Sequence, residues 1–193
     1  MNVEVIAMAK VSLKPAVALF PVPVILATTA DGAGKINVIT LAWAGTVCSQ
    51  PPMVSISVRP SRYSYELLKA NGEFVVHVPT EHLMWASDRC GTLSGRDLNK
   101  FDAAGLTAIA AEKVKAPLIA ECPVAMECVV RHVIPLGSHD LFLGEVVALH
   151  ANEEVLDKSG RIDPGLLWPL TYLQPEYWGV RERIGLHGYS RKE

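Results

Sequence analysis

The chain contains a succession of short β-type runs that end in turn signals, and this pattern constrains its fold more than any other feature of the sequence. Helical spacing is confined to residues 63–70 and 81–90, so helices and strands do not alternate regularly. A pattern of this kind favours a mainly β fold, a closed antiparallel barrel, over a parallel sheet. The expected strands cover residues 22–30, 36–47, 53–58, 74–78, 124–134 and 141–151.

At 193 residues, the chain has the length of one ordinary domain with a full hydrophobic core. It contains no internal repeat, low-complexity tract or charged linker, so we expect residues 1–193 to form a single domain. The 18 Lys and Arg residues against 20 Asp and Glu residues give a formal net charge of −2. No overall basic field exists to hold nucleic acid, so any anion must be bound locally.

Cysteine spacing and the apolar runs favour a protein of the reducing cytoplasm. The four cysteines include neither a C-x-x-C pair nor the dense spacing of a disulfide scaffold, so we expect buried, reduced thiols. The N-terminus lacks a signal pattern, and the apolar run 16–30 is too short to span a membrane and contains two prolines. No pair of histidines has the spacing of two metal ligands on one helical face, so no protein-bound metal is expected. The cysteines are Cys48, Cys90, Cys122 and Cys128.

Residues 59–64 carry the clearest candidate for a binding site. Two arginines and two serine hydroxyls converge where Pro60 ends a strand and a helix begins at Tyr63. A helix N-terminus offers unpaired amides and the positive end of a dipole, and arginine matches phosphate oxygens with two hydrogen bonds. Without further context, these residues fit two interpretations equally well. One is an anion site, and the other is purely structural, with Ser61 capping the helix and the arginines in solvent.

Residues 37–43 alternate polar and apolar side chains along a strand that ends in Trp43. Such a strand can present amide and hydroxyl groups to the polar edge of a flat heterocycle, although the same pattern is more often plain core. The nearby sequence Gly32-x-Gly34-Lys35 is interpreted as a turn, because the third glycine of a dinucleotide fingerprint is missing and Lys35 is followed by Ile36.

Seven sequence blocks, in order, resemble the flavin reductase-like, FMN-binding split-barrel family, and within it the flavoredoxin branch. The resemblance covers about residues 15–175 and implies an antiparallel split β-barrel, non-covalently bound FMN and a homodimer that completes the flavin site. The aromatic segment 163–193 is expected to pack on its own barrel or on the second subunit. The blocks are residues 21–24, 37–43, 51–52, 72–76, 91–101, 116–123 and 137–146.

The resemblance also implies roles for individual positions. The strand residues would lie along the isoalloxazine and the ribityl chain, a second group would surround the ribityl phosphate, and a third would cover the flavin. The first group is Asn37, Thr40, Leu41, Ala42 and Trp43, the second is Ser57, Arg59, Ser61, Arg62, Tyr63 and Ser64, and the third is Ser94, Arg96 and Lys100.

His139 lies in an expected hairpin turn, where a lone histidine is usually a surface residue. The resemblance gives it a catalytic role, because flavin reductases have a Gly-Asp-His pattern tied to the nicotinamide side of the site, but here Ser138 replaces the Asp. Two functions therefore remain open. One is an NAD(P)H:flavin oxidoreductase, and the other is a flavoredoxin whose tightly bound FMN is reduced by a protein partner.

Overall fold

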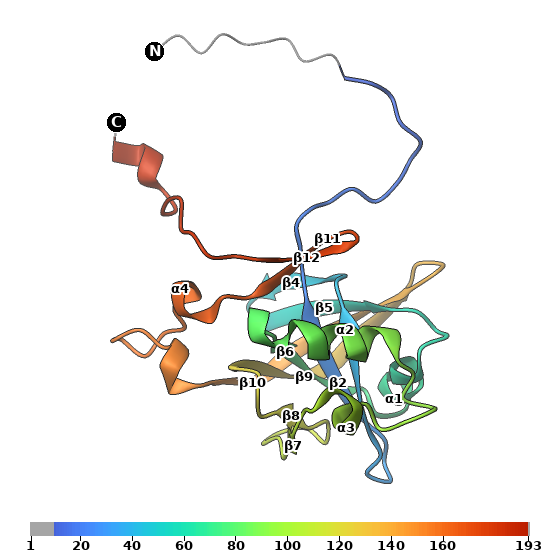
Figure 1. Ribbon diagram of the computed structural model, residues 1–193. Coiled ribbons are helices and arrows are strands. Elements are labelled where there is room, and N and C mark those ends of the chain that lie inside the picture. Colours follow the sequence, from blue (N-terminus) through green and yellow to red (C-terminus); the bar gives the residue numbers. More distant parts are fainter. Residues whose placement is uncertain (1–9, 193) are drawn as a thin grey trace.

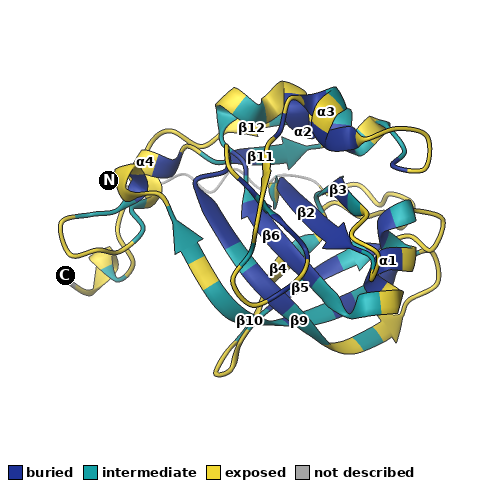
Figure 2. Ribbon diagram, turned by 90° about the horizontal axis from the view of Figure 1, so that it is seen from below, coloured by how far each residue is buried: buried dark blue, intermediate teal, exposed yellow. Residues whose placement is uncertain are grey.

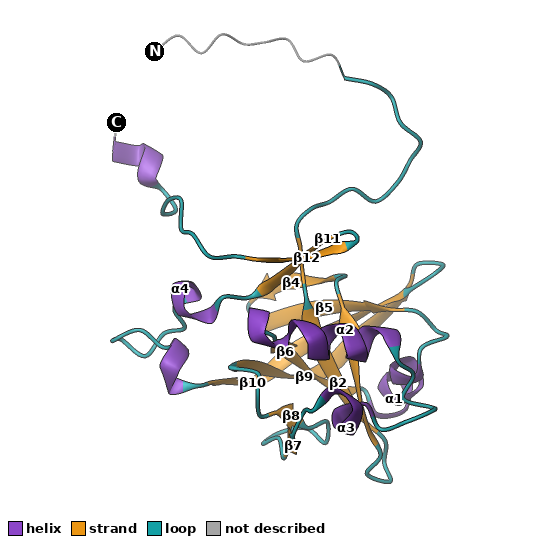
Figure 3. Cartoon of the chain, in the orientation of Figure 1, coloured by secondary structure: helices purple, strands orange, loops and turns teal. Residues whose placement is uncertain are grey.

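The chain folds as a β-rich split barrel, seen in a computed structural model that describes residues 10–192 (Figures 1 and 3). Residues 1–9 and 193 of the expected single domain lie outside this description, and the predicted absence of an N-terminal signal concerns them. The barrel is a seven-stranded antiparallel sheet with the order β3-β2-β6-β9-β10-β5-β4. Its strands are β2 Ile25–Ala30, β3 Ile36–Leu41, β4 Ala44–Ser49, β5 Pro52–Val58, β6 Glu73–Val78, β9 Val124–Pro135 and β10 Asp140–Ala151.

The other elements are short. Three small strands, β1 Val22–Pro23, β11 Leu170–Leu173 and β12 Glu176–Gly179, form a separate sheet, and β7 Ala108–Ile109 pairs with β8 Leu118–Ile119. The helices are α1 Tyr63–Asn71, α2 Met84–Thr92, α3 Lys100–Ala104 and α4 Pro164–Leu167, with 3₁₀ turns at Glu81–Leu83, Glu153–Val155 and Tyr189–Lys192. Within residues 10–192, no helix combines the length and the apolar character needed to cross a membrane.

The prediction of a single strand over residues 36–47 is wrong, because this segment contains β3 and most of β4. β3 pairs with β2 at one edge of the sheet, whereas β4 pairs with β5 at the other edge, so the chain must change direction between them. The change occurs at Ala42–Trp43, where the Trp43 carbonyl accepts a hydrogen bond of 2.9 Å from the Ser57 amide. Residues 93–99 form the loop between the two helices, since α2 continues through Thr92 and α3 begins at Lys100.

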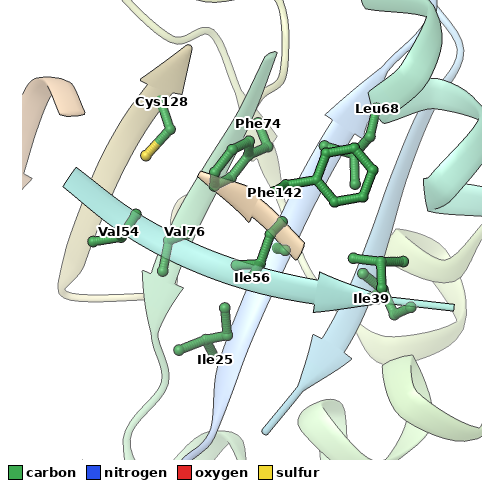
Figure 4. Close-up of a cluster of buried hydrophobic side chains, with 11 residues drawn as sticks. Ile25, Ile39, Val54, Ile56, Leu68, Phe74, Val76, Cys128 and Phe142 are labelled. Carbon is green, nitrogen blue, oxygen red and sulfur yellow. The ribbon is translucent and has the colours of Figure 1, made fainter. Parts of the chain in front are cut away.

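Alternating side chains of the strands fill the barrel interior. The central cluster includes Ile39, Ile56, Phe74 and Phe142, and Figure 4 shows it. Gly144 is required here, because a Cβ at this position would lie 2.4 Å from the Phe74 ring. Because these side chains fill the interior, a binding site is expected at the mouth of the barrel or on its outside.

Strand β2 is buried on both faces, as its dark blue colour in Figure 2 shows. The residues that point away from the interior, such as Leu26 and Val38, pack against Ala86, Cys90 and Phe101 of α2 and α3. These helices therefore lie against β2 and β3. Their packing places the α2–α3 loop beside β3, where Gly95 lies against Asn37.

Only part of the C-terminal segment packs on the rest of the protein. β11 pairs with β1 and β12, while Trp168 and Trp178 remain about half exposed. Beyond β12, residues 180–192 run away from the barrel (Figure 1). All four cysteines are free, but the expectation of buried thiols is wrong for Cys48, which is only partly buried.

Candidate functional site

Two adjoining pockets lie where β3 ends, between the start of α1, the α2–α3 loop and the β9–β10 turn. The inner pocket has a volume of about 50 Å³ and the outer pocket about 230 Å³, and they share Ile39, Arg62 and Gly91. Every residue that the sequence predicts for the site lines one of them. The inner pocket contains Asn37, Ser61, Arg62, Tyr63, Ser64, Ser94, Arg96 and Lys100, and the outer pocket contains Thr40, Leu41, Ala42, Trp43, Ser57, Arg59 and His139.

Lys100 is a buried cation in the wall of the inner pocket. Its residue is only 5% exposed, and its ammonium donates to the Cys90 carbonyl at 2.6 Å. Burial, with a smaller contribution from Arg62, lowers the pKa of Lys100 to about 8. An ammonium has three protons to donate, and among the described residues it has one acceptor. Such a group favours an anion in the pocket, because burying a charge without a counter-charge is costly.

The N-terminus of α1 forms another wall of the inner pocket. Arg62 is the N-cap residue and makes no side-chain capping bond, so the proposed Ser61 cap is wrong. The Tyr65 amide donates to the Arg62 carbonyl at 3.0 Å, so the Tyr63 and Ser64 amides are the ones left for an anion, and the helix dipole favours negative charge there. Asn37 donates to the Ser64 hydroxyl at 2.7 Å, and both residues are buried. This hydrogen bond fixes α1 against β3.

The α2–α3 loop closes the inner pocket through Arg96. One guanidinium nitrogen of Arg96 donates to the Ser61 carbonyl at 3.1 Å, and another pairs with Glu66 of α1. The guanidinium also lies 5.5 Å from the centre of the Tyr63 ring, which carries Lys35 at 4.6 Å. Arg96 thus joins the loop to the start of α1.

The outer pocket is built around His139 and Trp43. Their ring centres are 4.3 Å apart, with planes inclined by 41°. The Arg59 Nε donates to His139 Nε2 at 3.4 Å, so the histidine proton lies on Nδ1, where the Ser138 hydroxyl is 2.9 Å away. Burial and the charges of Arg59 and Arg62 lower the pKa of His139. His139 is therefore a neutral imidazole at pH 7, and its side chain folds back from the turn onto the pocket.

The structure groups some predicted residues differently from the family resemblance. Asn37 lies in the inner pocket rather than with the other β3 residues, whereas Ser57 and Arg59 lie in the outer pocket rather than at the proposed phosphate. Thr40 uses its hydroxyl to donate to the Ser87 carbonyl of α2 at 2.5 Å. Of the predicted site residues, only Arg62 borders both pockets.

Sequence reasoning missed two side chains of the outer pocket. Tyr172 and Gln174 come from the β11–β12 hairpin, far along the chain from Trp43. The aromatic composition of this segment indicated that it packs on something, but no spacing in the sequence indicates which surface it meets. The hairpin reaches the pocket because β11 pairs with β1, which precedes β2.

Residues 17–181 match the model of the flavin reductase like domain, and this region contains every residue that lines the two pockets. An uncharacterized protein of Archaeoglobus fulgidus is 38% identical over 133 residues, which cover 69% of this chain and 74% of that protein. Flavoredoxin of Desulfovibrio vulgaris (Miyazaki F) is similar in structure, with a TM-score of 0.88 and 31% identity over 95% of this chain and 100% of that chain. An FMN-binding protein from Thermus thermophilus has a TM-score of 0.79 and 25% identity, covering 93% of this chain and 99% of that chain.

Proposed function

The chain belongs to the family of flavin reductase-like domains and has the fold of its FMN-binding members. From this premise we propose that one FMN occupies both pockets and passes reducing equivalents from NAD(P)H to an acceptor. The phosphate would lie in the inner pocket and the isoalloxazine in the outer pocket. NAD(P)H would approach the ring from the open side.

The observation that carries this proposal is the pairing of a small cationic pocket with a larger aromatic one. A phosphate monoester needs positive charge and amide donors, which the buried Lys100, the exposed Arg62 and the start of α1 offer. A flavin ring needs a flat apolar neighbour and donors at its polar edge, which Trp43, Arg59 and Ser57 offer. The residues of the two pockets therefore fit FMN from end to end.

Some side chains would bind the FMN phosphate, and others would orient the reacting rings. Each charge-assisted hydrogen bond from Lys100 or Arg62 to the phosphate would contribute about 1.5–3 kcal/mol. Bound FMN supplies the hydride chemistry itself. Arg59 lines the outer pocket, where its guanidinium would supply positive charge to a flavin ring that gains electrons on reduction. His139, whose pKa is lowered and whose ring is tilted against that of Trp43, would offer a surface that orients a nicotinamide.

A second candidate function is that of a flavoredoxin, an electron-transfer protein reduced by a protein partner. The likeness to the Desulfovibrio flavoredoxin favours it, and so does Ser138, which stands where the reductase pattern has an Asp. The half-exposed Trp43 would then border the surface that meets the partner's redox centre.

Anaerobic absorption spectra of the purified protein distinguish the two candidates. The FMN-loaded protein is mixed with NADH, then with NADPH, and the flavin absorbance is followed. Bleaching within seconds by either nucleotide supports the oxidoreductase. Bleaching by dithionite but by neither nucleotide within minutes supports the flavoredoxin. A protein that takes up no flavin contradicts both.

We also propose that two copies assemble as a homodimer around the flavin sites. In the extended segment 10–20, alternate apolar residues Val11, Leu13, Val17 and Leu19 are 66–81% exposed. A further hollow of about 250 Å³, mostly apolar, lies beside the outer pocket between Phe20, Trp43 and Tyr172. A second copy would cover this exposed apolar surface. Light scattering at micromolar concentration is expected to give twice the 20.9 kDa monomer mass, and the monomer mass would contradict the dimer.

A further inference from the structure

Resting on the proposed flavin function, we propose that Glu66 and Arg96 form a latch that closes the phosphate end of the inner pocket and makes the protein select FMN over FAD. The latch is defined as the Glu66–Arg96 ion pair together with the loop that carries Arg96, residues 93–99. Both residues act by positioning the pocket wall rather than by contact with the reacting atoms.

The guanidinium of Arg96 is already engaged by the protein. It pairs with Glu66, donates to the Ser61 carbonyl and lies over the Tyr63 ring. All three partners belong to α1 or to the residues that lead into it. Arg96 therefore holds the loop to the helix, and it does so at the rim of the pocket where the phosphate would lie.

The loop is also seated tightly on the other side of the pocket. A Cβ on Gly95 would lie 2.1 Å from the Asn37 amide oxygen and 3.0 Å from the Tyr63 ring, so the backbone rests directly on both side chains. A turn, in which the Asp97 amide donates to the Ser94 carbonyl at 3.1 Å, shapes the segment. The loop thus spans from β3 to α1 and closes the inner pocket between them.

This closure treats the two flavin nucleotides differently. The ribityl phosphate of FMN is a terminal dianionic monoester, which ends inside the pocket. The same phosphate in FAD is joined through an anhydride bond to a second phosphate, which carries an adenosine. A pocket of about 50 Å³ holds a terminal group, and an onward chain would have to displace Arg96 or Gly95. FAD therefore meets a steric barrier that FMN does not.

The latch is able to open, because its ion pair is exposed to solvent. The side chains of Arg96 and Glu66 are 42% and 56% exposed. An exposed pair of this kind shifts an equilibrium by at most about fivefold. FMN can then bind and leave as the loop moves, while the closed form disfavours the larger nucleotide.

Two measurements test the latch. Quenching of flavin fluorescence gives the affinities for FMN and FAD, and stopped-flow mixing gives the rate of FMN release. Glu66→Gln removes the ion pair without touching the pocket lining, and Arg96→Ala removes the wall. The matched control is Glu145→Gln, which breaks the exposed Arg131–Glu145 pair away from both pockets. We expect Glu66→Gln to speed FMN release about 3-fold. We expect Arg96→Ala to lower the FMN:FAD affinity ratio by about 10-fold or more, and the control to change neither quantity.

The outcomes separate the latch from the flavin function. A wild type that binds FMN and FAD equally overturns the latch but leaves flavin binding intact. An unchanged affinity ratio in Arg96→Ala, with unchanged release in Glu66→Gln, also overturns it. A wild type that binds neither flavin overturns the proposed function itself. Folding of each variant is checked by circular dichroism, and Glu66→Gln provides the test if Arg96→Ala is unstable.

Discussion

The inner and outer pockets share three residues but are built in opposite ways. The inner pocket is closed by buried polar groups, with Asn37 3% exposed and Lys100 5% exposed. The outer pocket is open and is bordered by Trp43, which is 44% exposed, and by side chains of the β9–β10 turn. Charges interact more strongly in the buried pocket, where solvent screens them least. If one FMN occupies both pockets as we propose, retention and reactivity would be separable along that ligand, with most of the affinity arising in the inner pocket.

The largest change in affinity is expected when the ligand lacks the phosphate. Riboflavin lacks the group that Lys100 and Arg62 would hold, so it should bind at least about 100-fold more weakly than FMN, since two charge-assisted contacts are worth about 3–6 kcal/mol. Titration of the apoprotein with each flavin measures the difference. Equal affinities would show that the inner pocket does not hold the phosphate.

A smaller effect is expected from Gly95→Ala, which disturbs the inner pocket alone. The added Cβ would overlap the Asn37 amide oxygen, so the loop must shift at a cost of about 1–3 kcal/mol, or roughly 5- to 150-fold in FMN affinity. Gly45→Ala is the matched control, because a Cβ there has no neighbour within 4 Å. An FMN affinity that stays at the wild-type value in Gly95→Ala would contradict the close seating of the loop.

The pH dependence of FMN affinity should follow Lys100. Because burial lowers its pKa to about 8, the ammonium of the free protein loses its proton as the pH rises through 8. The phosphate dianion favours the protonated form, so FMN affinity is constant below this pH and falls by up to about 10-fold per pH unit above it. Cys90 stays protonated in this range, since burial raises its pKa to about 11.

Flavin fluorescence titrations from pH 7 to about 9 measure this dependence. Riboflavin serves as the control, because its binding does not involve the phosphate. The variant Lys100→Met should bind FMN more weakly and without the change near pH 8. A flat profile for the wild type would show that Lys100 does not face the anion.

His139→Ala should have the smallest effect on affinity and should act on reduction instead. Its FMN dissociation constant is expected to stay within about 3-fold of the wild type, while reduction by NAD(P)H slows roughly 10-fold. Stopped-flow absorbance measures both steps. Ser138→Ala removes only the partner of His139 Nδ1, so its rate of reduction should fall between those of the wild type and His139→Ala. Unchanged reduction in His139→Ala would leave the histidine as a turn residue alone.

The sequence alone determined the features that depend on neighbouring residues. The alternation in residues 53–58 predicted β5, and the Asp31–Lys35 segment predicted the turn, in which Asp31 accepts hydrogen bonds from the Ala33 and Lys35 amides. Helical spacing after Pro60 predicted α1 to within one residue at its end. Local patterns at residues 37–43 and 59–64 predicted part of the residues that line the two pockets, whereas Ser94, Arg96, Lys100 and His139 were predicted by the family resemblance.

Only the tertiary structure decided how those residues are combined. The break at Ala42–Trp43 arises because β3 and β4 pair at opposite edges of the sheet. Lys100 becomes a buried cation because α3 packs against β3, and Arg96 becomes a closing residue because Glu66 lies opposite. Tyr172 and Gln174 reach the outer pocket through pairing between β11 and β1. Each of these outcomes depends on contacts between segments far apart in the chain, and the burial, pairing and charge environment that they create have no local pattern in the sequence.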